Sequence, residues 1–323
     1  MTERKFKTVF FGTPDFSIPT LEMLAQNPEI DLIKVVTMPD RPAGRGQHLS
    51  PPPVAVCAKN RHISLCQTAN INKEESLLAE FVQEKVDLFI VLAFAQFLSE
   101  KLLKIPAIGA FNIHTSLLPK YRGAAPIQYA LLAGEQSTGV SIQKMVKEMD
   151  AGDLVYGHSV EISKEENSET LFNKLKIEAA KGCEKFITQL SSGEIIYTPQ
   201  DHGLASYAPT IKKNDGYVDF VTCSRQKIER MLKAYYPWPG IFCFIAGQRL
   251  KIFDVTEEKM ALSPGKIFLD FGTLLVGCSD GALRLREIQL EGKKISGDQE
   301  LVVALKNKYQ SSPEMIVLTP LKE

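Results

Sequence analysis

The sequence predicts a Rossmann-like α/β domain with a doubly wound sheet, followed by a smaller β-barrel domain. In the first 190 residues, short apolar strands alternate with helical segments, which is the pattern of a doubly wound sheet. Beyond residue 206, short strands follow one another with glycine-rich turns between them, which is typical of a small barrel. Residues 191–206 are rich in Ser, Gly, Pro and polar residues. We therefore expect domains at 1–190 and 207–323, joined by a linker at 191–206.

Length and composition agree with two ordinary globular domains. The chain has 323 residues, of which 44% are apolar and 24% charged. Its formal net charge is zero, so overall charge does not predict binding to a polyanion. Six cysteines are scattered without a CxxC pair, which favours neither a metal site nor a disulfide framework. Apolar runs stay well below the ~18 residues of a membrane span. We expect a cytoplasmic monomer with no metal and no membrane partner.

The first domain opens with a strand, a turn, a helix and a second strand. Residues 8–12 form a short apolar run ended by Gly12, residues 16–26 fit a helix, and residues 30–37 form the second apolar strand. A dinucleotide-binding protein would carry G-x-G-x-x-G after the first strand, and here Gly12 is followed by Thr13 and Pro14. A nicotinamide-dependent enzyme is therefore a weak alternative.

The remaining elements follow from periodicity and from glycine and proline positions. We expect further helices at 53–60, 73–84, 123–134 and 168–190, and further strands at 86–93, 110–114, 138–146 and 154–162. In the second domain we expect a helix near 225–235 and strands at 241–245, 249–255, 265–268, 273–276 and 282–290.

Residues 38–48 form the most unusual surface segment. Prolines and glycines in Pro39-Asp-Arg-Pro-Ala-Gly-Arg-Gly46 exclude helix and strand and predict a long exposed loop. The loop carries Arg41 and Arg45, and guanidinium groups suit phosphates and bases. A solvated basic loop without a ligand is the alternative that composition leaves open.

The strand at 110–114 carries the residues of greatest chemical interest. Asn112 and His114 are two residues apart, so both side chains lie on one face of the strand. One supplies an amide donor and the other titrates near neutral pH. This pair suits a reaction in which a carbonyl oxygen gains charge while a proton moves. A half-buried strand with its polar residues in water is the alternative.

A longer pattern decides between these alternatives. Asn112 and His114 begin the motif Asn-x-His-x-Ser-Leu-Leu-Pro, and Asp150 begins a later Asp-x-Gly. This combination resembles the formyltransferases that use 10-formyltetrahydrofolate. The resemblance implies that Asn112 donates to a tetrahedral oxyanion. It also implies that His114 serves as donor or base, and that Asp150 favours the charged imidazole and relays protons through water. The segment expected in the tetrahydrofolate site is Ser116, Leu117, Leu118 and Pro119. No tightly bound cofactor is expected, because 10-formyltetrahydrofolate is a co-substrate that donates the formyl group.

The resemblance extends to nucleic acid. Residues 39–46 match a loop that enters the acceptor stem in the family members that act on charged initiator tRNA. It implies that Arg41 and Arg45 contact tRNA, and that the C-terminal domain is an OB-like, tRNA-binding barrel. Residues 235–240 resemble the family's junction with this barrel. Its basic candidates are Lys212, Lys213, Lys251, Lys293 and Lys294. The expected activity is formylation of the methionine amino group on charged initiator tRNA, for translation initiation.

The chain departs from the family pattern at Phe94-Ala95, Ser99 and Thr115, where Tyr-Gly, Pro and Gly are common. Two alternatives remain. One is a formyltransferase acting on a purine precursor ribonucleotide or an amino-sugar nucleotide. The other is a tRNA-binding protein that has kept the fold without the reaction.

Overall fold

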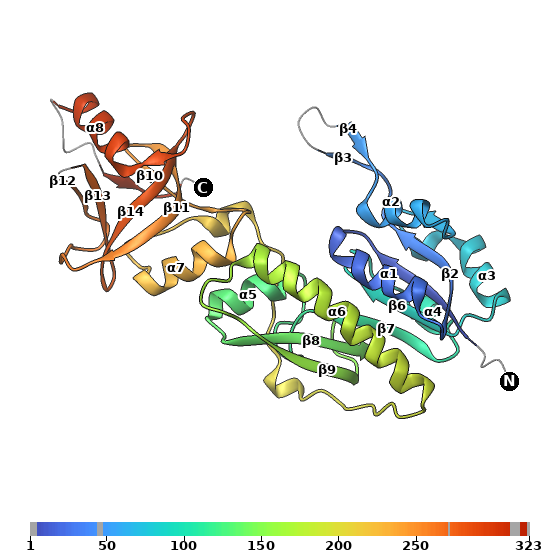
Figure 1. Cartoon of the computed structure of the whole chain (residues 1–323). Helices are drawn as coiled ribbons and strands as arrows, with labels where there is room; N and C mark the ends of the chain where they lie inside the picture. The colour runs from blue at the N-terminus through green and yellow to red at the C-terminus, as the bar shows by residue number, and fades with distance from the viewer. Residues whose placement is uncertain (1–4, 44–47, 271, 311–316, 322–323) are drawn as a thin grey trace. The chain divides into compact units, whose positions relative to one another are not determined.

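A computed structural model describes residues 5–43, 48–270, 272–310 and 317–321. The chain divides into two units, and Figure 1 labels their helices and strands. The first holds the chain up to Pro126 together with Gln136–Ile162 and Leu171–Pro209. The second holds Ile127–Glu135, Ser163–Thr170 and the chain from Thr210. The expected linker, residues 191–206, thus falls within the first unit, and its role as a linker stays a prediction.

The first unit is built on a seven-stranded sheet with the order β5-β2-β1-β6-β7-β8-β9. Neighbours from β5 to β7 are parallel, whereas β8 is antiparallel to β7 and to β9. The strands are β1 (Phe6–Gly12), β2 (Ile30–Thr37), β5 (Leu65–Gln67), β6 (Leu88–Leu92), β7 (Gly109–His114), β8 (Ser137–Lys144) and β9 (Leu154–Glu161). The predicted α/β sheet is confirmed.

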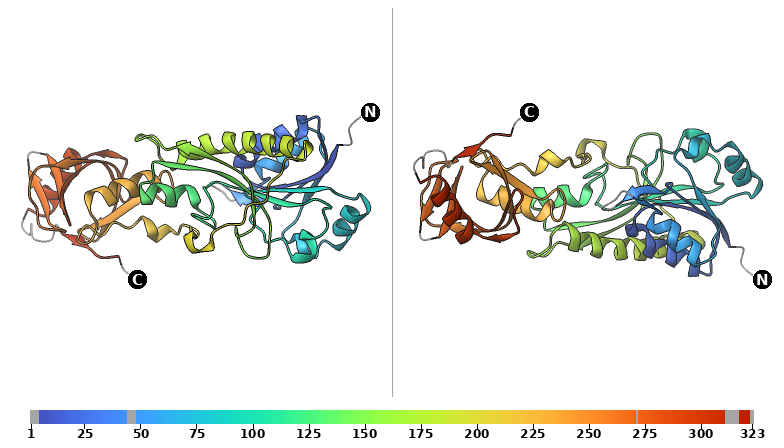
Figure 2. Two further views of the ribbon diagram at one scale, coloured as in Figure 1. Left: turned by 90° about the horizontal axis from the view of Figure 1, so that it is seen from below. Right: turned by 90° about the horizontal axis from the view of Figure 1, so that it is seen from above.

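Helices cover both faces of this sheet, as the two views of Figure 2 show. On one face, α1, α2 and α6 contribute buried side chains, and Phe186 of α6 packs on Phe111 of β7. On the other face, α3 and α4 enclose a core with the odd-numbered residues of β1 and β6. The helices are α1 (Ile18–Gln26), α2 (Pro53–Asn60), α3 (Glu75–Gln83), α4 (Glu100–Leu103) and α6 (Ser168–Ser191), which lies in this unit from Leu171 on. Helix α5 (Pro126–Ala133) falls in the second unit apart from its first residue.

The strand order places a switch point between β1 and β6. From β1 the chain moves to β2 and β5 on one side, then returns to β6 and β7 on the other. Ligands of open α/β sheets bind outside the carboxyl ends of strands at such a point. His114, the last residue of β7, therefore lies at the end of the sheet where a site is expected.

The second unit is an antiparallel curled sheet with the path β12-β13-β14-β11-β10-β16, and β15 pairs with β14. Helix α8 packs on β13 and β14, and α7 packs on β11. A curled antiparallel sheet agrees with the predicted small barrel. Its elements are α7 (Arg225–Ala234), β10 (Ile241–Ile245), β11 (Gln248–Glu258), β12 (Ile267–Asp270), β13 (Thr273–Cys278), β14 (Gly281–Leu290), β15 (Ser296–Gly297), α8 (Asp298–Lys308) and β16 (Leu318–Thr319).

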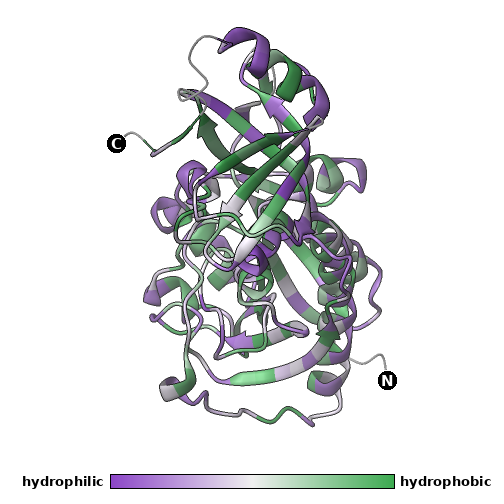
Figure 3. Ribbon diagram, turned by 90° about the vertical axis from the view of Figure 1, so that its left-hand side faces the viewer, coloured by the Kyte–Doolittle hydropathy of each residue, from purple (hydrophilic) through white to green (hydrophobic). Residues whose placement is uncertain are grey.

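Hydropathy varies along each element. Figure 3 shows hydrophobic and hydrophilic residues interspersed along both helices and strands. Among the described residues, no helix is both long enough and apolar enough to cross a bilayer.

The structure corrects the prediction that residues 39–46 contain no strand. Strand β3 (Arg41–Ala43) pairs antiparallel with β4 (His48–Ser50). Pro42 is tolerated because a two-stranded ribbon consists of edge strands, where a missing N–H costs little. Helix α8 was not predicted at all.

The Asn72 side chain contacts the segment that follows β6. Its amide donates to the Phe97 carbonyl (2.7 Å) and accepts from the Ser99 N–H (2.8 Å). Asn72 therefore fixes the loop after β6. Ser99, at the position where proline is common, caps α4 by accepting from the Leu102 N–H.

Candidate active site

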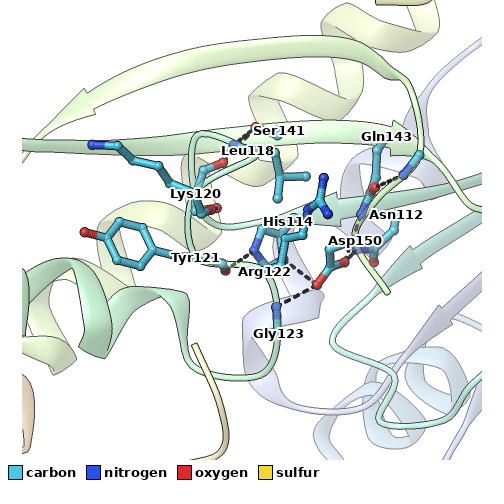
Figure 4. Close-up of polar contacts among 12 residues, drawn as sticks. Asn112, His114, Leu118, Lys120, Tyr121, Arg122, Gly123, Ser141, Gln143 and Asp150 are labelled. Carbon is cyan, nitrogen blue, oxygen red and sulfur yellow. Dashed lines mark hydrogen bonds and ion pairs between the residues drawn. The ribbon is translucent and has the colours of Figure 1, made fainter. Parts of the chain in front are cut away.

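The two polar residues of β7 reach one carboxylate. Asn112 and His114 alternate with buried Phe111 and Ile113 along the strand, so both side chains leave the sheet on the same face. Asp150 lies there, 38 residues further along the chain from Asn112, and Figure 4 shows the three side chains facing one another. The predicted trio is brought together.

Neutral groups hold the Asp150 carboxylate. Oδ1 accepts from the Asn112 amide (3.1 Å) and from the Gln143 amide (2.8 Å), and Oδ2 accepts from the Gly123 N–H (2.9 Å). His114 Nδ1 lies 3.7 Å from Oδ2. The Asp150 side chain is only 10% exposed. Its charge is therefore stabilised by three N–H dipoles and faces an imidazole, and no lysine or arginine of the described residues forms an ion pair with it.

The backbone at Asp150 is left-handed, with φ of 52°. Such a conformation costs about 1–2 kcal/mol in a residue with a side chain and is kept only where neighbours enforce it. The structure also explains why the Asp-x-Gly pattern has glycine at position 152. A Cβ at this position would lie 1.7 Å from the Lys144 carbonyl oxygen, so no larger residue allows the turn to return to β8.

The imidazole of His114 has a defined tautomer. Its Nε2 lies 2.9 Å from the Tyr121 carbonyl oxygen, which can only accept, so Nε2 carries a proton. Nδ1 then faces Asp150. In the neutral ring Nδ1 is a free acceptor for a proton, and in the charged ring it is a donor directed at the carboxylate. The His114 side chain is 7% exposed, which limits competition from water.

The turn after β7 is fixed by side chains and by one close backbone approach. Ser116 donates to the Lys120 carbonyl (2.6 Å), and Ser141 of β8 donates to the Ser116 carbonyl (2.7 Å) while accepting from the Leu118 N–H (3.1 Å). Ser116 and Leu118 are buried, and Leu117 and Pro119 are partly exposed. Gly123 has φ of 119°, and a Cβ there would lie 2.8 Å from the Ala208 carbonyl oxygen. The turn thus presents Ser116–Pro119 as a rigid loop beside His114.

Gln143 and the Gly123 N–H are two partners of Asp150 that were not predicted from the sequence. Gln143 lies directly opposite Asn112 in the antiparallel pairing of β7 and β8. Strand β8 reads Ser-Thr-Gly-Val-Ser-Ile-Gln-Lys, so its sequence does not single out Gln143 among several polar residues, although Gln143 is only 2% exposed in the structure. Apart from the presence of a glycine, nothing in the sequence predicts that the Gly123 N–H contacts Asp150.

The segment that follows the carboxyl end of β6 buries Phe94 and Leu98. Phe94 is 2% exposed and packs edge-on against Phe11 in the core, and Leu98 is buried in the same cluster. Ala93 and Ala95, on either side of Phe94, are exposed and left-handed, with φ of 51° and 65°. The left-handed backbone turns Phe94 inward, and the exposed residues of this segment are Ala93, Ala95 and Phe97, the last of which is 67% exposed.

The residues expected to contact tRNA lie on the surface where the structure describes them. Arg41 begins β3 and is exposed, whereas Arg45 lies outside the described residues. The Asp40 carboxylate accepts a hydrogen bond from the Gln67 amide (2.7 Å). The side-chain partner that the structure gives Asp40 is therefore Gln67, and not the nearby Arg41. The five basic candidates of the second unit, Lys212, Lys213, Lys251, Lys293 and Lys294, are all exposed.

The chemistry that this arrangement supports is addition to a carbonyl carbon. An amide donor beside an imidazole–carboxylate pair is a combination of groups that suits stabilisation of an oxyanion and transfer of a proton. Within the described ranges, histidine, cysteine, aspartate and glutamate side chains form no group of three or more that could hold a metal ion.

Comparison with known proteins agrees with this chemistry. Residues 6–187 match the formyl transferase family, and residues 210–303 match the formyl transferase C-terminal domain. The methionyl-tRNA formyltransferase of Geobacter metallireducens is 39% identical over 295 residues, which are 91% of this chain and 94% of that protein. The methionyl-tRNA formyltransferase of Thermotoga maritima is also 39% identical, over 89% of this chain and 92% of that protein.

Solved structures share the fold at much lower identity. An N-formyltransferase from Helicobacter canadensis, solved with folinic acid and dTDP-3-aminofucose, has a TM-score of 0.64 at 17% identity, covering 90% of this chain and 100% of that chain. HypX from Aquifex aeolicus, solved with tetrahydrofolic acid, has a TM-score of 0.56 at 15% identity. It covers 91% of this chain and 46% of that chain.

Proposed function

The chain belongs to the methionyl-tRNA formyltransferase family, and we propose that it transfers the formyl group of 10-formyltetrahydrofolate to the amino group of methionine on charged initiator tRNA. The observation that carries this proposal is the joint position of Asn112, His114 and Asp150 at the carboxyl end of β7. In this chain the trio is intact and held in a buried network, which favours an enzyme over a tRNA-binding protein without activity.

Asn112 is the proposed donor to the oxyanion. Its Nδ2 carries two hydrogens, and Asp150 accepts one of them at 3.1 Å. Within the described residues, the second hydrogen has no protein partner. The amide is therefore oriented by Asp150 with one hydrogen left for the formyl oxygen, which gains negative charge when the amine attacks the formyl carbon.

His114 and Asp150 move the proton. The attacking amine becomes positively charged as the new C–N bond forms, and it must lose one proton before the C–N10 bond to the folate breaks. His114 Nδ1 accepts this proton, directly or through a water, while Nε2 keeps its bond to the Tyr121 carbonyl. The carboxylate 3.7 Å away stabilises the resulting imidazolium. The same proton then goes to N10 of the departing tetrahydrofolate, so acid and base are restored.

The rigid loop Ser116–Pro119 is proposed to form part of the donor site. It follows His114 directly, and its buried serine and leucine hold its shape before any ligand binds. Two of the structural neighbours were solved with tetrahydrofolic acid or folinic acid, which supports a folate-derived donor for this fold. Such a donor binds and leaves in each turnover, as a co-substrate.

Charged initiator tRNA is the proposed acceptor, with Arg41 and Arg45 contacting its backbone and the second unit contributing exposed lysines. These contacts rest on the exposed position of Arg41 in the ribbon β3–β4, on the basic sequence of residues 39–46, and on the identity to methionyl-tRNA formyltransferases over both units. The proposed reaction places the enzyme in the cytoplasm with translation initiation.

The experiment is transfer of labelled formyl from 10-formyltetrahydrofolate, with charged initiator methionyl-tRNA, free methionine, an amino-sugar nucleotide and a purine precursor ribonucleotide as parallel acceptors. Label on the tRNA alone is the expected result. Label on one of the small acceptors would replace the tRNA in the proposal while keeping the trio. Absence of transfer to any acceptor would contradict the proposal as a whole.

A further inference from the structure

A buried arginine lies beside the trio, and in the part of the chain that the structure describes no carboxylate lies within 4 Å of its guanidinium except that of Glu148, at 4.0 Å. Arg122 is only 1% exposed, and the ion pair that it makes, with the exposed Glu148, spans 4.0 Å. Its backbone pairs with the segment after α6, since the Arg122 N–H donates to Ser206 and its carbonyl accepts from Ala208. A buried guanidinium costs several kcal/mol unless its donors are satisfied. Its partners therefore indicate what the protein gains from it.

The main partner is the amide of Gln200, which comes from the segment first expected to be a linker. Gln200 Oε1 accepts from Arg122 Nη2 (2.7 Å) and Nε (3.3 Å). Its Nε2 donates to the carbonyl oxygens of Asp150 (2.9 Å) and Gly152 (2.7 Å). Arg122 can only donate, so it also decides which way the amide points. Gln200 is 6% exposed, and both of its ends are engaged.

These bonds hold the two carbonyls that flank the strained turn. Asp150 has a left-handed backbone, and its carboxylate must meet Asn112, Gln143 and the Gly123 N–H at once. The side-chain bonds fix the carboxylate, whereas Gln200 fixes the backbone from which it projects. Arg122 further ties the two sides together, because the next residue, Gly123, donates its N–H to the same carboxylate.

We propose that Gln200 is a positioning residue for formyl transfer, holding the Asp150 backbone in its left-handed conformation with its orientation set by Arg122. The inference rests on the proposed function for its kinetic consequences. Its structural content, that Gln200 immobilises residues 150–152, does not depend on which acceptor is formylated.

The decisive variant is Gln200→Glu, which has the same size and keeps a partner for Arg122. The carboxylate can still bind the guanidinium but can no longer donate to the two carbonyls, and it repels them. We expect kcat to fall about 10²-fold, the loss typical of a catalytic group displaced by about an ångström. The KM values for both substrates stay within about twofold, because binding surfaces are unchanged. Gln83→Glu, the same change at an exposed position at the end of α3, is the matched control and should leave kcat unchanged.

A second variant separates positioning from charge. Gln200→Met removes both the donors and the acceptor of the amide, so kcat should fall in this variant as well. Normal activity in Gln200→Glu with loss in Gln200→Met would mean that Gln200 serves only to satisfy Arg122, which overturns the proposal. If Gln200→Glu does not fold, Gln200→Asn takes its place with the same expectation, because its shorter amide cannot reach both carbonyls.

Coupling to Asp150 gives a readout that a merely structural residue would not move. In an Asp150→Asn background, Gln200→Glu should add little further loss of kcat, because the group that it positions is already gone. If the fold-losses in kcat of Asp150→Asn and Gln200→Glu multiply in the double variant, the proposal is overturned. Hydrogen exchange of the peptide covering residues 145–153 tests it without turnover. Exchange at 150–152 should rise in Gln200→Glu, and unchanged exchange together with unchanged kcat would contradict the proposal whatever the acceptor is.

Discussion

Two buried carboxylates, one in each unit, are held in opposite ways. Asp150 accepts from two side-chain amides and one backbone N–H, and an imidazole faces it at 3.7 Å. Asp298, the first residue of α8, accepts from Arg284 Nε (2.8 Å) and Nη2 (3.1 Å) and from the Leu274 N–H (3.0 Å). Their side chains are similarly buried, 10% and 5% exposed. Burial therefore does not distinguish them, whereas the charge of their partners does.

The difference separates a carboxylate that we propose to act in the reaction from one that stabilises the fold. A guanidinium bound to both oxygens lowers the affinity of a carboxylate for a proton and fully occupies it. Burial raises the pKa of Asp298, but the Arg284 hydrogen bonds and the Leu274 N–H outweigh it, so the pKa is lowered overall. Neutral amides orient Asp150 while leaving its charge to act on His114. The two sites make separate predictions for activity and for stability.

The largest effect is expected at Asp150. Asp150→Asn keeps the shape but removes the charge that stabilises the imidazolium, so kcat should fall about 10²–10⁴-fold, the usual contribution of acid–base groups. Steady-state formylation of methionyl-tRNA measures it, with Asp298→Asn as the matched control. If Asp298→Asn reduced kcat as strongly, the division of roles would be wrong.

Asn112→Ala should reduce kcat almost as strongly as Asp150→Asn. It removes the proposed oxyanion donor, and loss of one such donor typically costs about 10²–10³ in kcat. Binding of tRNA should be unchanged, because Asn112 is not part of the proposed nucleic-acid surface. A filter-binding measurement alongside the kinetics separates the two, and an unchanged kcat would remove Asn112 from the mechanism.

For stability we expect the opposite order, with Asp298→Asn lowering the free energy of unfolding more than Asp150→Asn does. Asp298→Asn gives up charge-assisted hydrogen bonds in the second unit, each typically worth about 1.5–3 kcal/mol. Arg284 is partly solvated, so the free energy of unfolding should fall by about 1–3 kcal/mol in total. Urea unfolding followed in the second unit measures this. A smaller loss than for Asp150→Asn would contradict the contrast.

Acid should affect the second unit through the same aspartate. Its pKa in the folded state is lowered, so its contribution to stability is complete above the unfolded pKa of about 3.9 and is lost as the pH falls through the lower folded value. The urea midpoint of the second unit should therefore drop below about pH 4. Asp298→Asn should flatten this part of the profile, and an unaltered slope would assign the acid sensitivity to other groups.

The smallest effect concerns left-handed backbone, a conformation that Asp150 shares with Ala95. Ala95 is exposed and has φ of 65°, which glycine adopts more readily. Ala95→Gly should raise the free energy of unfolding by up to about 1 kcal/mol, reduced by the greater freedom of glycine in the unfolded chain. Thermal unfolding measures it. A loss of stability would show that the loop after β6 does not strain Ala95.

Much of the fold was predictable because its signals are local. The bounds predicted for β2, α2 and β10 coincide with those observed, since each is an apolar or amphipathic run ended by proline, asparagine or glycine. The ribbon β3–β4 was missed because proline and glycine argue against strands in general, while an edge strand tolerates them. Helix α8 was missed because its weakly amphipathic sequence becomes helical by packing on β13 and β14.

The sequence by itself determined which groups are available for chemistry, because the two-residue period of a strand places Asn112 and His114 on one face without reference to the rest of the chain. Tertiary structure decided how they are held. The partners of Asp150 come from positions 38, 7, 27 and 50 residues away in the chain, namely Asn112, Gln143, Gly123 and Gln200. No local period connects such positions. Only the pairing of β7 with β8 and the return of the segment after α6 bring them within hydrogen-bonding distance.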